Sequence, residues 1–243
     1  MNRFIAALLT LGLGVLGTSS ISDATITFPG ASGDLAAQAD FTVSGNTLTV
    51  VLTNTSTADV MVPADVLTAI FFDIAGYPPG TLSPFSAFLS GGSTVFFGPN
   101  GGGNVGGEWA YASGLSGAPD NASLGISSAG FGLFGGANFN GSNLEGPTAV
   151  NGLNYGLVSA GDNTTTGNAA VTGGVPLIKN QVTFTLTGSV PFSESDISNV
   201  SFQYGTSLTE PNVPSGGNPP PVPEPSTMLL LGIALSGTGG ISF

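Results

Sequence analysis

The residues best suited to chemistry in this sequence are Glu108 and its aromatic neighbours Trp109 and Tyr111. Two carboxylates are enough to hydrolyse a glycosidic bond, so Glu108 could act as the acid of a glycosidase. Aromatic rings offer flat apolar faces for sugars, so Trp109 and Tyr111, together with Tyr155, could instead form a carbohydrate-binding module. A structural interpretation stays open as well. Residues 108–112 also fit a half-buried strand, with Trp109 and Tyr111 on one face.

A second candidate site is the loop Gly161-Asp-Asn-Thr-Thr-Thr-Gly-Asn168. Asp162, Asn163 and Asn168 supply hard oxygen ligands of the kind that calcium prefers. Their spacing departs from that of an EF-hand, and polar loops of this composition also form without a metal. The loop therefore predicts either a calcium site or a polar loop without a metal. Loss of thermal stability in a chelator would indicate calcium.

Composition excludes several other mechanisms. The chain has no His and no Cys, which removes thiolate chemistry, Cys/His zinc sites and His-based acid–base catalysis. Apart from Arg3 at the N-terminus, Lys179 is the only basic residue, and we expect it to form a structural ion pair, with Asp73 as a candidate partner. The formal net charge of −12 repels phosphate backbones, so nucleic acid is not an expected partner.

The elements that must position these residues are short strands. Alternation with a period of two marks residues 24–28, 39–43, 47–54 and 181–187, and Ser44-Gly-Asn46 is a hairpin turn. Leu67–Ile74 is apolar in both phases of the alternation, so we expect a central strand of a two-layer core with Phe71 and Phe72 both buried. Ile197–Tyr204 is expected to be the last strand.

The pattern predicts an all-β fold. Only 7% of the 243 residues are charged, whereas 41% are hydrophobic and 39 are Gly, which suits a secreted β protein with Gly-rich turns. No sustained helical period occurs between residues 25 and 210. We therefore expect a single antiparallel β-sandwich of jelly-roll or immunoglobulin-like kind over residues 25–210. A Pro/Gly-rich linker is expected over residues 211–222.

The N-terminus has the form of a secretory signal peptide. Arg3 gives a positive start, residues 4–16 form an apolar run, and Ser22 and Ala24 occupy the −3 and −1 positions of a cleavage site. We expect a signal helix over residues 1–24 with cleavage after Ala24. A membrane anchor is the alternative interpretation.

The C-terminal residues carry the most specific motif. Pro223-Glu-Pro225 follows a proline-rich spacer and precedes the apolar run Met228-Leu-Leu-Leu-Gly-Ile-Ala-Leu235. Residues 223–243 resemble the sorting tail of PEP-CTERM surface proteins, which are exosortase-dependent. In that family the Pro-Glu-Pro tripeptide is the recognition element, here Pro223, Glu224 and Pro225. The family also has an apolar helix in the membrane and a terminal basic cluster. The printed residues up to Phe243 contain no such cluster, so we expect weak membrane retention before processing.

The resemblance implies a destination and a processing enzyme. It implies a bacterial protein exported to the cell envelope, cell surface or extracellular matrix, with an exosortase-type enzyme and the membrane as partners of the tail. It also implies association with exopolysaccharide. The favoured hypothesis is thus a non-enzymatic exported surface protein. A carbohydrate-binding module and an acid-based glycosidase are the alternatives.

Overall fold

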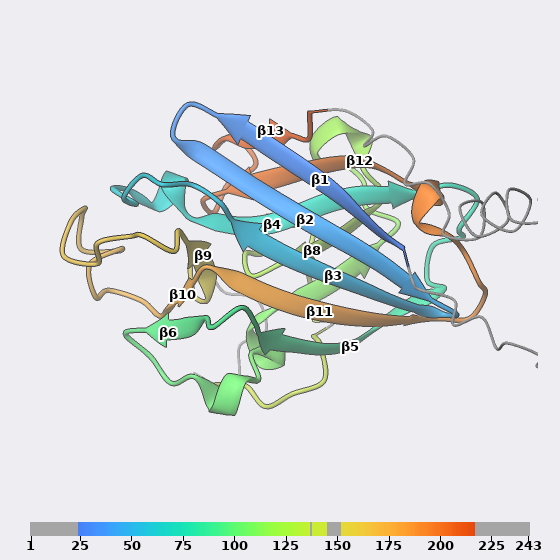
Figure 1. Ribbon diagram of the computed structural model, residues 1–243, viewed down its shortest axis with the longest axis horizontal. Coiled ribbons are helices and arrows are strands. Elements are labelled where there is room, and N and C mark those ends of the chain that lie inside the picture. Colours follow the sequence, from blue (N-terminus) through green and yellow to red (C-terminus); the bar gives the residue numbers. More distant parts are fainter. Residues whose placement is uncertain (1–23, 137, 145–151, 217–243) are drawn as a thin grey trace, which may run out of the picture.

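The protein folds as two packed β-sheets (Figure 1). The computed structural model describes residues 24–136, 138–144 and 152–216. The first sheet has five antiparallel strands, in the order β1 (Thr25–Ser32), β2 (Leu35–Ser44), β3 (Thr47–Asn54), β11 (Gln181–Gly188) and β5 (Leu82–Leu89). The expected all-β sandwich is confirmed.

The second sheet is less regular. Its main path runs through β13 (Asn212–Pro214), β12 (Ile197–Tyr204), β4 (Leu67–Ile74), β9 (Gly156–Val158), β10 (Leu177–Lys179) and β6 (Thr94–Phe96). Two further strands branch from β4, namely β8 (Leu124–Ser127) and, paired with it, β7 (Ala110–Ser113). All helical turns in the described residues are short 3-10 segments: η1 (Pro63–Asp65), η2 (Gly101–Gly103), η3 (Gly106–Glu108), η4 (Pro119–Asn121) and η5 (Glu194–Asp196). None of these helices is long and apolar enough to cross a membrane.

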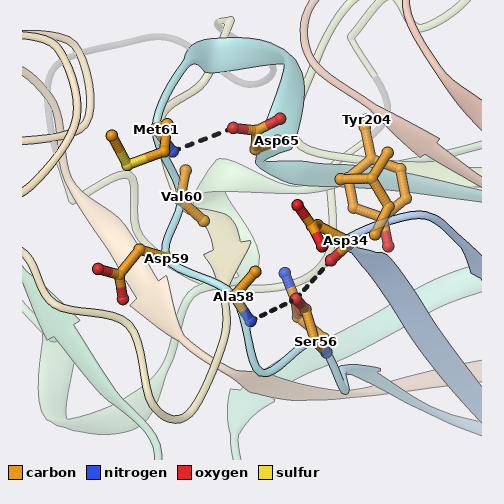
Figure 2. Close-up of a pocket in the computed structure, with 10 residues that line it drawn as sticks. Asp34, Ser56, Ala58, Asp59, Val60, Met61, Asp65 and Tyr204 are labelled. Atoms are coloured by element: carbon orange, nitrogen blue, oxygen red, sulfur yellow. Dashed lines mark hydrogen bonds between the residues drawn. The ribbon is translucent and has the colours of Figure 1, made fainter.

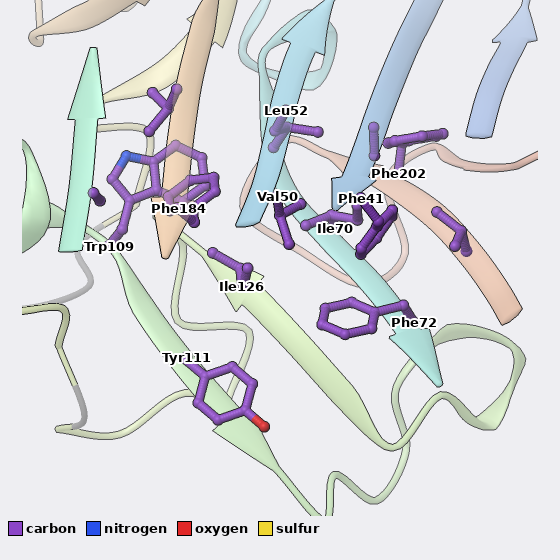
Figure 3. Packing of buried hydrophobic residues seen from close by; sticks show 14 of the residues in the cluster. Phe41, Val50, Leu52, Ile70, Phe72, Trp109, Tyr111, Ile126, Phe184 and Phe202 are labelled. Atoms are coloured by element: carbon purple, nitrogen blue, oxygen red, sulfur yellow. The ribbon is translucent and has the colours of Figure 1, made fainter. Parts of the chain in front are cut away.

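The main core fills the space between the two sheets. Phe28 on β1 and Phe72 on β4 both make edge contacts with Phe41 of β2, at ring-centroid distances of 5.6 and 5.3 Å. Figure 3 shows Phe41 and Phe72 in this core. Alternation along β2, β3 and β11 turns every second side chain into this core, as the period-two pattern predicts. Burial of these apolar side chains is the main stabilising contribution to the fold.

Strand β4 is central, and both of its faces are buried. Phe71 and Phe72 are each 0% exposed, which confirms the expectation for this strand. The core is not simply two-layered, however. Phe72 faces the other sheet, whereas Phe71 lies in a separate apolar cluster with Phe134. Loop residues after β7 and β8 therefore cover the outer side of the second sheet at this point.

The domain extends further toward the C-terminus than the sequence predicts. Residues 212–214, which we assigned to the linker, form β13 on the edge of the second sheet, and Val213 is buried. The backbone N–H of Gly216 also donates to the carbonyl oxygen of Pro29 at 2.9 Å. The domain therefore extends past the predicted boundary at residue 210, because the prolines that suggested a linker are compatible with an edge strand.

Candidate functional site

The structure buries the aromatic side chains that the sequence suggested for sugar binding. Trp109 is 0% and Tyr111 4% exposed, and Figure 3 shows both inside the core. The Trp109 ring packs against Phe184 at a centroid distance of 4.9 Å. Tyr155 is also fully buried, and its hydroxyl donates to the carbonyl oxygen of Pro99. A sugar platform needs exposed rings, so this assignment is wrong. The alternative of a half-buried strand over residues 108–112 is right only in part, because Glu108 ends η3, β7 begins at Ala110, and residues 108–111 are all buried.

Glu108 does not occupy a cleft either. Its side chain is 2% exposed, and its Oε1 atom accepts a hydrogen bond from the backbone N–H of Leu144 at 2.9 Å. A glycosidase acid must reach the oxygen of a bound substrate, which this burial prevents. The acid role assigned to Glu108 is therefore not supported. In the structure the carboxylate connects η3 to the segment that ends the described range 138–144.

The three side chains of the candidate calcium loop accept backbone hydrogen bonds, one of them from the distant segment that contains Val60. Asp162 Oδ1 accepts from the Val60 N–H at 2.7 Å, Asn163 Oδ1 from the Thr165 N–H at 3.2 Å, and Asn168 Oδ1 from the Ala170 N–H at 3.2 Å. Within the described ranges, no group of three or more His, Cys, Asp or Glu side chains is placed to hold a metal. These contacts occupy one side-chain oxygen of each of the three residues, so we expect the loop to form without a metal.

Asp162 provides a test that separates the two interpretations. Burial raises the pKa of its carboxyl, the Val60 N–H lowers it, and the neighbouring Asp59 carboxylate raises it further. Because the pKa of Asp162 is higher in the folded than in the unfolded protein, the protonated carboxyl stabilises the fold. This stabilisation is present at low pH and is lost as pH rises through the folded-state pKa. The substitution Asp162→Asn keeps an acceptor for Val60 and removes the charge. We expect it to be at least as stable as the parent at pH 7.

The matched substitution Asp162→Ala leaves the buried Val60 N–H without its acceptor, and we expect a loss of about 1–3 kcal/mol in the free energy of unfolding. Denaturant melts of the three proteins at pH 7, with calcium and with EDTA, measure both effects. We expect the chelator to change none of the midpoints. A denaturation midpoint that falls in EDTA for the parent but not for Asp162→Asn would instead establish a calcium site.

Lys179 and Asp73 do not form the expected ion pair. Asp73 Oδ1 accepts from the N–H and the hydroxyl of Ser123 at 2.8 and 2.5 Å, and its Oδ2 accepts from Asn199 Nδ2 at 2.8 Å. These contacts tie β4 to β12 and to the residue before β8. The neutral partners satisfy the carboxylate at the end of the strand, so a distant lysine is not needed there.

The small pocket in Figure 2 lies beside the β1–β2 turn and the loop that precedes η1. It has a volume of about 80 Å³, and Asp59, Asp65 and Tyr204 contribute to its wall. Asp65 Oδ2 accepts from the N–H groups of Met61 and Val62, so this carboxylate caps η1. A space of this size suits a few water molecules rather than a sugar ring.

Tyr204 gives this pocket its one unusual feature. Its hydroxyl is buried and has no hydrogen-bond partner among the described residues, and burial raises the pKa of the phenol. The hydroxyl therefore stays protonated across the physiological range. A buried water in the pocket would satisfy it.

Exposed aromatic residues do occur, but on a strand that sequence reasoning missed. Phe85 and Phe88 lie on β5 and are 52% and 45% exposed. The segment Leu82–Leu89 contains Pro84 and lacks clean alternation, so it was not predicted as a strand. β5 is the edge strand of the five-stranded sheet, where a proline is tolerated. The sequence feature that could have indicated this exposed strand is the placement of Phe85 and Phe88 among serines.

The comparisons with known proteins concern the C-terminal tail. Residues 221–242 match the family model described as the PEP-CTERM protein-sorting motif. The chain carries a PEP-CTERM sorting signal. No curated protein and no solved structure matches the chain. Pro223, Glu224 and Pro225 lie inside the matched range and outside the residues that the structure describes.

The PEP-CTERM motif fixes the destination of the protein. It indicates an exported protein that is sorted by an exosortase-type signal and is anchored at, or secreted to, the cell envelope or surface. The described sandwich ends at Gly216, so residues 217–220 separate it from the matched range. The predicted signal peptide, residues 1–24, lies outside the described residues except for Ala24, and β1 begins at the next residue, Thr25.

Proposed function

We propose that this PEP-CTERM protein is a non-enzymatic component of the bacterial surface or extracellular matrix. In this proposal a signal peptide starts export, the β-sandwich is the folded head, and an exosortase-type enzyme processes the tail. The observation that carries the proposal is the sorting motif at residues 221–242, which begins five residues after Gly216, the last described residue of the sandwich.

Two further features support a non-enzymatic role with extracellular polysaccharide. The sequence lacks His and Cys, and its most promising acid, Glu108, is buried. The low charge content also suits a protein that stays soluble among hydrated neutral polymers. We therefore propose further that the protein associates with exopolysaccharide.

The test is to replace the recognition tripeptide in a bacterium that has an exosortase. For the parent we expect a shortened protein in the envelope fraction or the medium. A chain in which Pro223, Glu224 and Pro225 are all alanine should remain unprocessed and keep its full-length tail, because the processing enzyme no longer recognises it. The readouts are the mass of the mature protein and its distribution between fractions.

A matched control changes two prolines just outside the motif, Pro219→Ala with Pro220→Ala. This control should be processed like the parent. The same parent chain in a strain without the exosortase should resemble the tripeptide variant. Equal processing of the parent and the tripeptide variant would refute the sorting role of these residues.

A further inference from the structure

The outer face of the five-stranded sheet is a regular array of hydroxyl groups. This face points toward the reader in Figure 1. One row of directly opposed residues crosses all five strands, and every member carries a hydroxyl: Thr25, Thr42, Thr49, Thr185 and Ser86. The alternation that turns Phe41, Val50 and Phe184 into the core places these residues on the solvent side.

The hydroxyls at the centre of this row are available to a ligand. Thr25 and Thr42 share a hydrogen bond of 2.7 Å at one end. Among the described residues, the hydroxyls of Thr49 and Thr185 have no side-chain or backbone partner. Both residues are half-buried, with part of their surface open to solvent. They can therefore donate and accept hydrogen bonds toward solvent or a bound molecule.

The same face carries an exposed aromatic ring. The row next to the hydroxyl row pairs Thr183 of β11 with Phe88 of β5, which places Phe88 on the solvent side as well. Val51, opposite Thr183 on β3, adds a further apolar contact. A flat ring beside a line of hydroxyls offers the two kinds of contact that sugars need, namely an apolar surface for the ring face and hydrogen-bonding groups for the ring edge.

The near absence of charged side chains on this face favours a neutral ligand. In the two rows the one charged residue is Asp40, and its carboxylate already accepts hydrogen bonds from Thr27 and Gln38. No Lys or Arg lies on these strands, so an anionic polymer gains no ion pair here and meets the repulsion of a chain with a net charge of −12. A neutral ligand matches this surface best.

The spacing and twist of the strands favour a single extended polymer chain over a flat crystalline surface. Neighbouring strands lie about 4.8 Å apart, so the five hydroxyls of the row span about 19 Å. The spacing is comparable to the length of one sugar unit, so each strand could serve one unit of an extended chain. Strands in a sheet are rotated by roughly 20–25° relative to each other, so the row follows a curve. A flexible chain can follow this curve, whereas a flat crystalline surface cannot.

We propose that the outer face of β1, β2, β3, β11 and β5 binds a neutral polysaccharide chain, with Thr49 and Thr185 as hydrogen-bonding residues and Phe88 as the stacking residue. This inference rests on the proposed surface function and names the part of the molecule that contacts the polymer. It replaces the buried Trp109, Tyr111 and Tyr155 with residues that a ligand can reach.

Affinity electrophoresis of the purified full chain tests the proposal. The probes are three neutral polymers, dextran, hydroxyethylcellulose and galactomannan, and the anionic polymer alginate. We expect retardation by at least one neutral polymer, with little dependence on salt, and none by alginate. Phe88→Ala should weaken this retardation about tenfold, equivalent to about 1.4 kcal/mol. The double variant Thr49→Val with Thr185→Val should do the same, and Thr49→Ser with Thr185→Ser should retain binding.

Phe97→Ala is the matched control, since Phe97 is also 45% exposed but follows β6 in the other sheet. It should bind like the parent, and circular dichroism checks that every variant is folded. Absence of retardation by all three neutral polymers would overturn the proposal, as would equal binding by the Phe88 and Phe97 variants or a preference for alginate. A parent that dimerises through this face in sedimentation experiments would also overturn it. None of these outcomes would affect processing of the tail, so failure here is distinguishable from failure of the sorting assignment.

Discussion

The substitution Phe72→Ala is expected to lower the free energy of unfolding by about 3–5 kcal/mol. Phe72 is fully buried between the two sheets and contacts the edge of Phe41. Both sheets are hydrogen-bonded along their strands, so they cannot collapse into the cavity that the missing ring leaves. A loss of this size is a large part of the stability of an ordinary domain.

The neighbouring substitution Phe71→Ala provides an internal comparison. Phe71 is equally buried, but it packs against Phe131 and Phe134 of a loop rather than against a second sheet. A loop can relax into a cavity more easily than a sheet, so we expect a cost nearer the lower end of the same range. Denaturant melts followed by the fluorescence of Trp109, the single tryptophan, measure both. A change below 1 kcal/mol for Phe72→Ala would contradict its place in the core.

The substitution Trp109→Ala is the second large expected effect, again about 3–5 kcal/mol. The Trp109 ring is fully buried and lies against Phe184, which in turn contacts Phe139 at 5.2 Å. Its indole N–H has no partner among the described residues, so the loss comes from packing and not from a broken hydrogen bond. Circular dichroism during denaturation is the suitable measurement, because the variant has no tryptophan.

A surface phenylalanine is the control for Trp109. Phe85→Ala removes a ring that is 52% exposed, and we expect a change within about 0.5 kcal/mol. In the parent, Trp109 emission should be shifted to short wavelength and should not respond to added polysaccharide. Two results together would show that Trp109 is exposed and would support the first hypothesis of sugar binding: quenching of this emission by a sugar polymer, and unchanged stability of Trp109→Ala.

Local patterns in the chain are enough to predict the fold class and the destination. Alternating residues in β2, β3 and β11 specify strands because the side-chain period of a strand is two, and this pattern is local. The doubly apolar run of β4 specifies a central strand for the same reason. The tripeptide Pro223-Glu-Pro225 and the apolar run after it are also read from the chain directly, since a sorting enzyme recognises a linear segment.

The tertiary structure alone decided which polar and aromatic residues face solvent. Trp109 and Glu108 have types that suit a sugar site, but their exposure depends on distant segments: Phe184 of β11 packs against Trp109, and Leu144 bonds to Glu108. In the same way, β5 became a strand because β11 offered it a free edge, although Pro84 weakens its local tendency. Pairing partners that are far apart in sequence leave no local pattern. The hydroxyl row exists only because five strands align in one register, and a shift of one residue in any of them would turn its threonine or serine into the core.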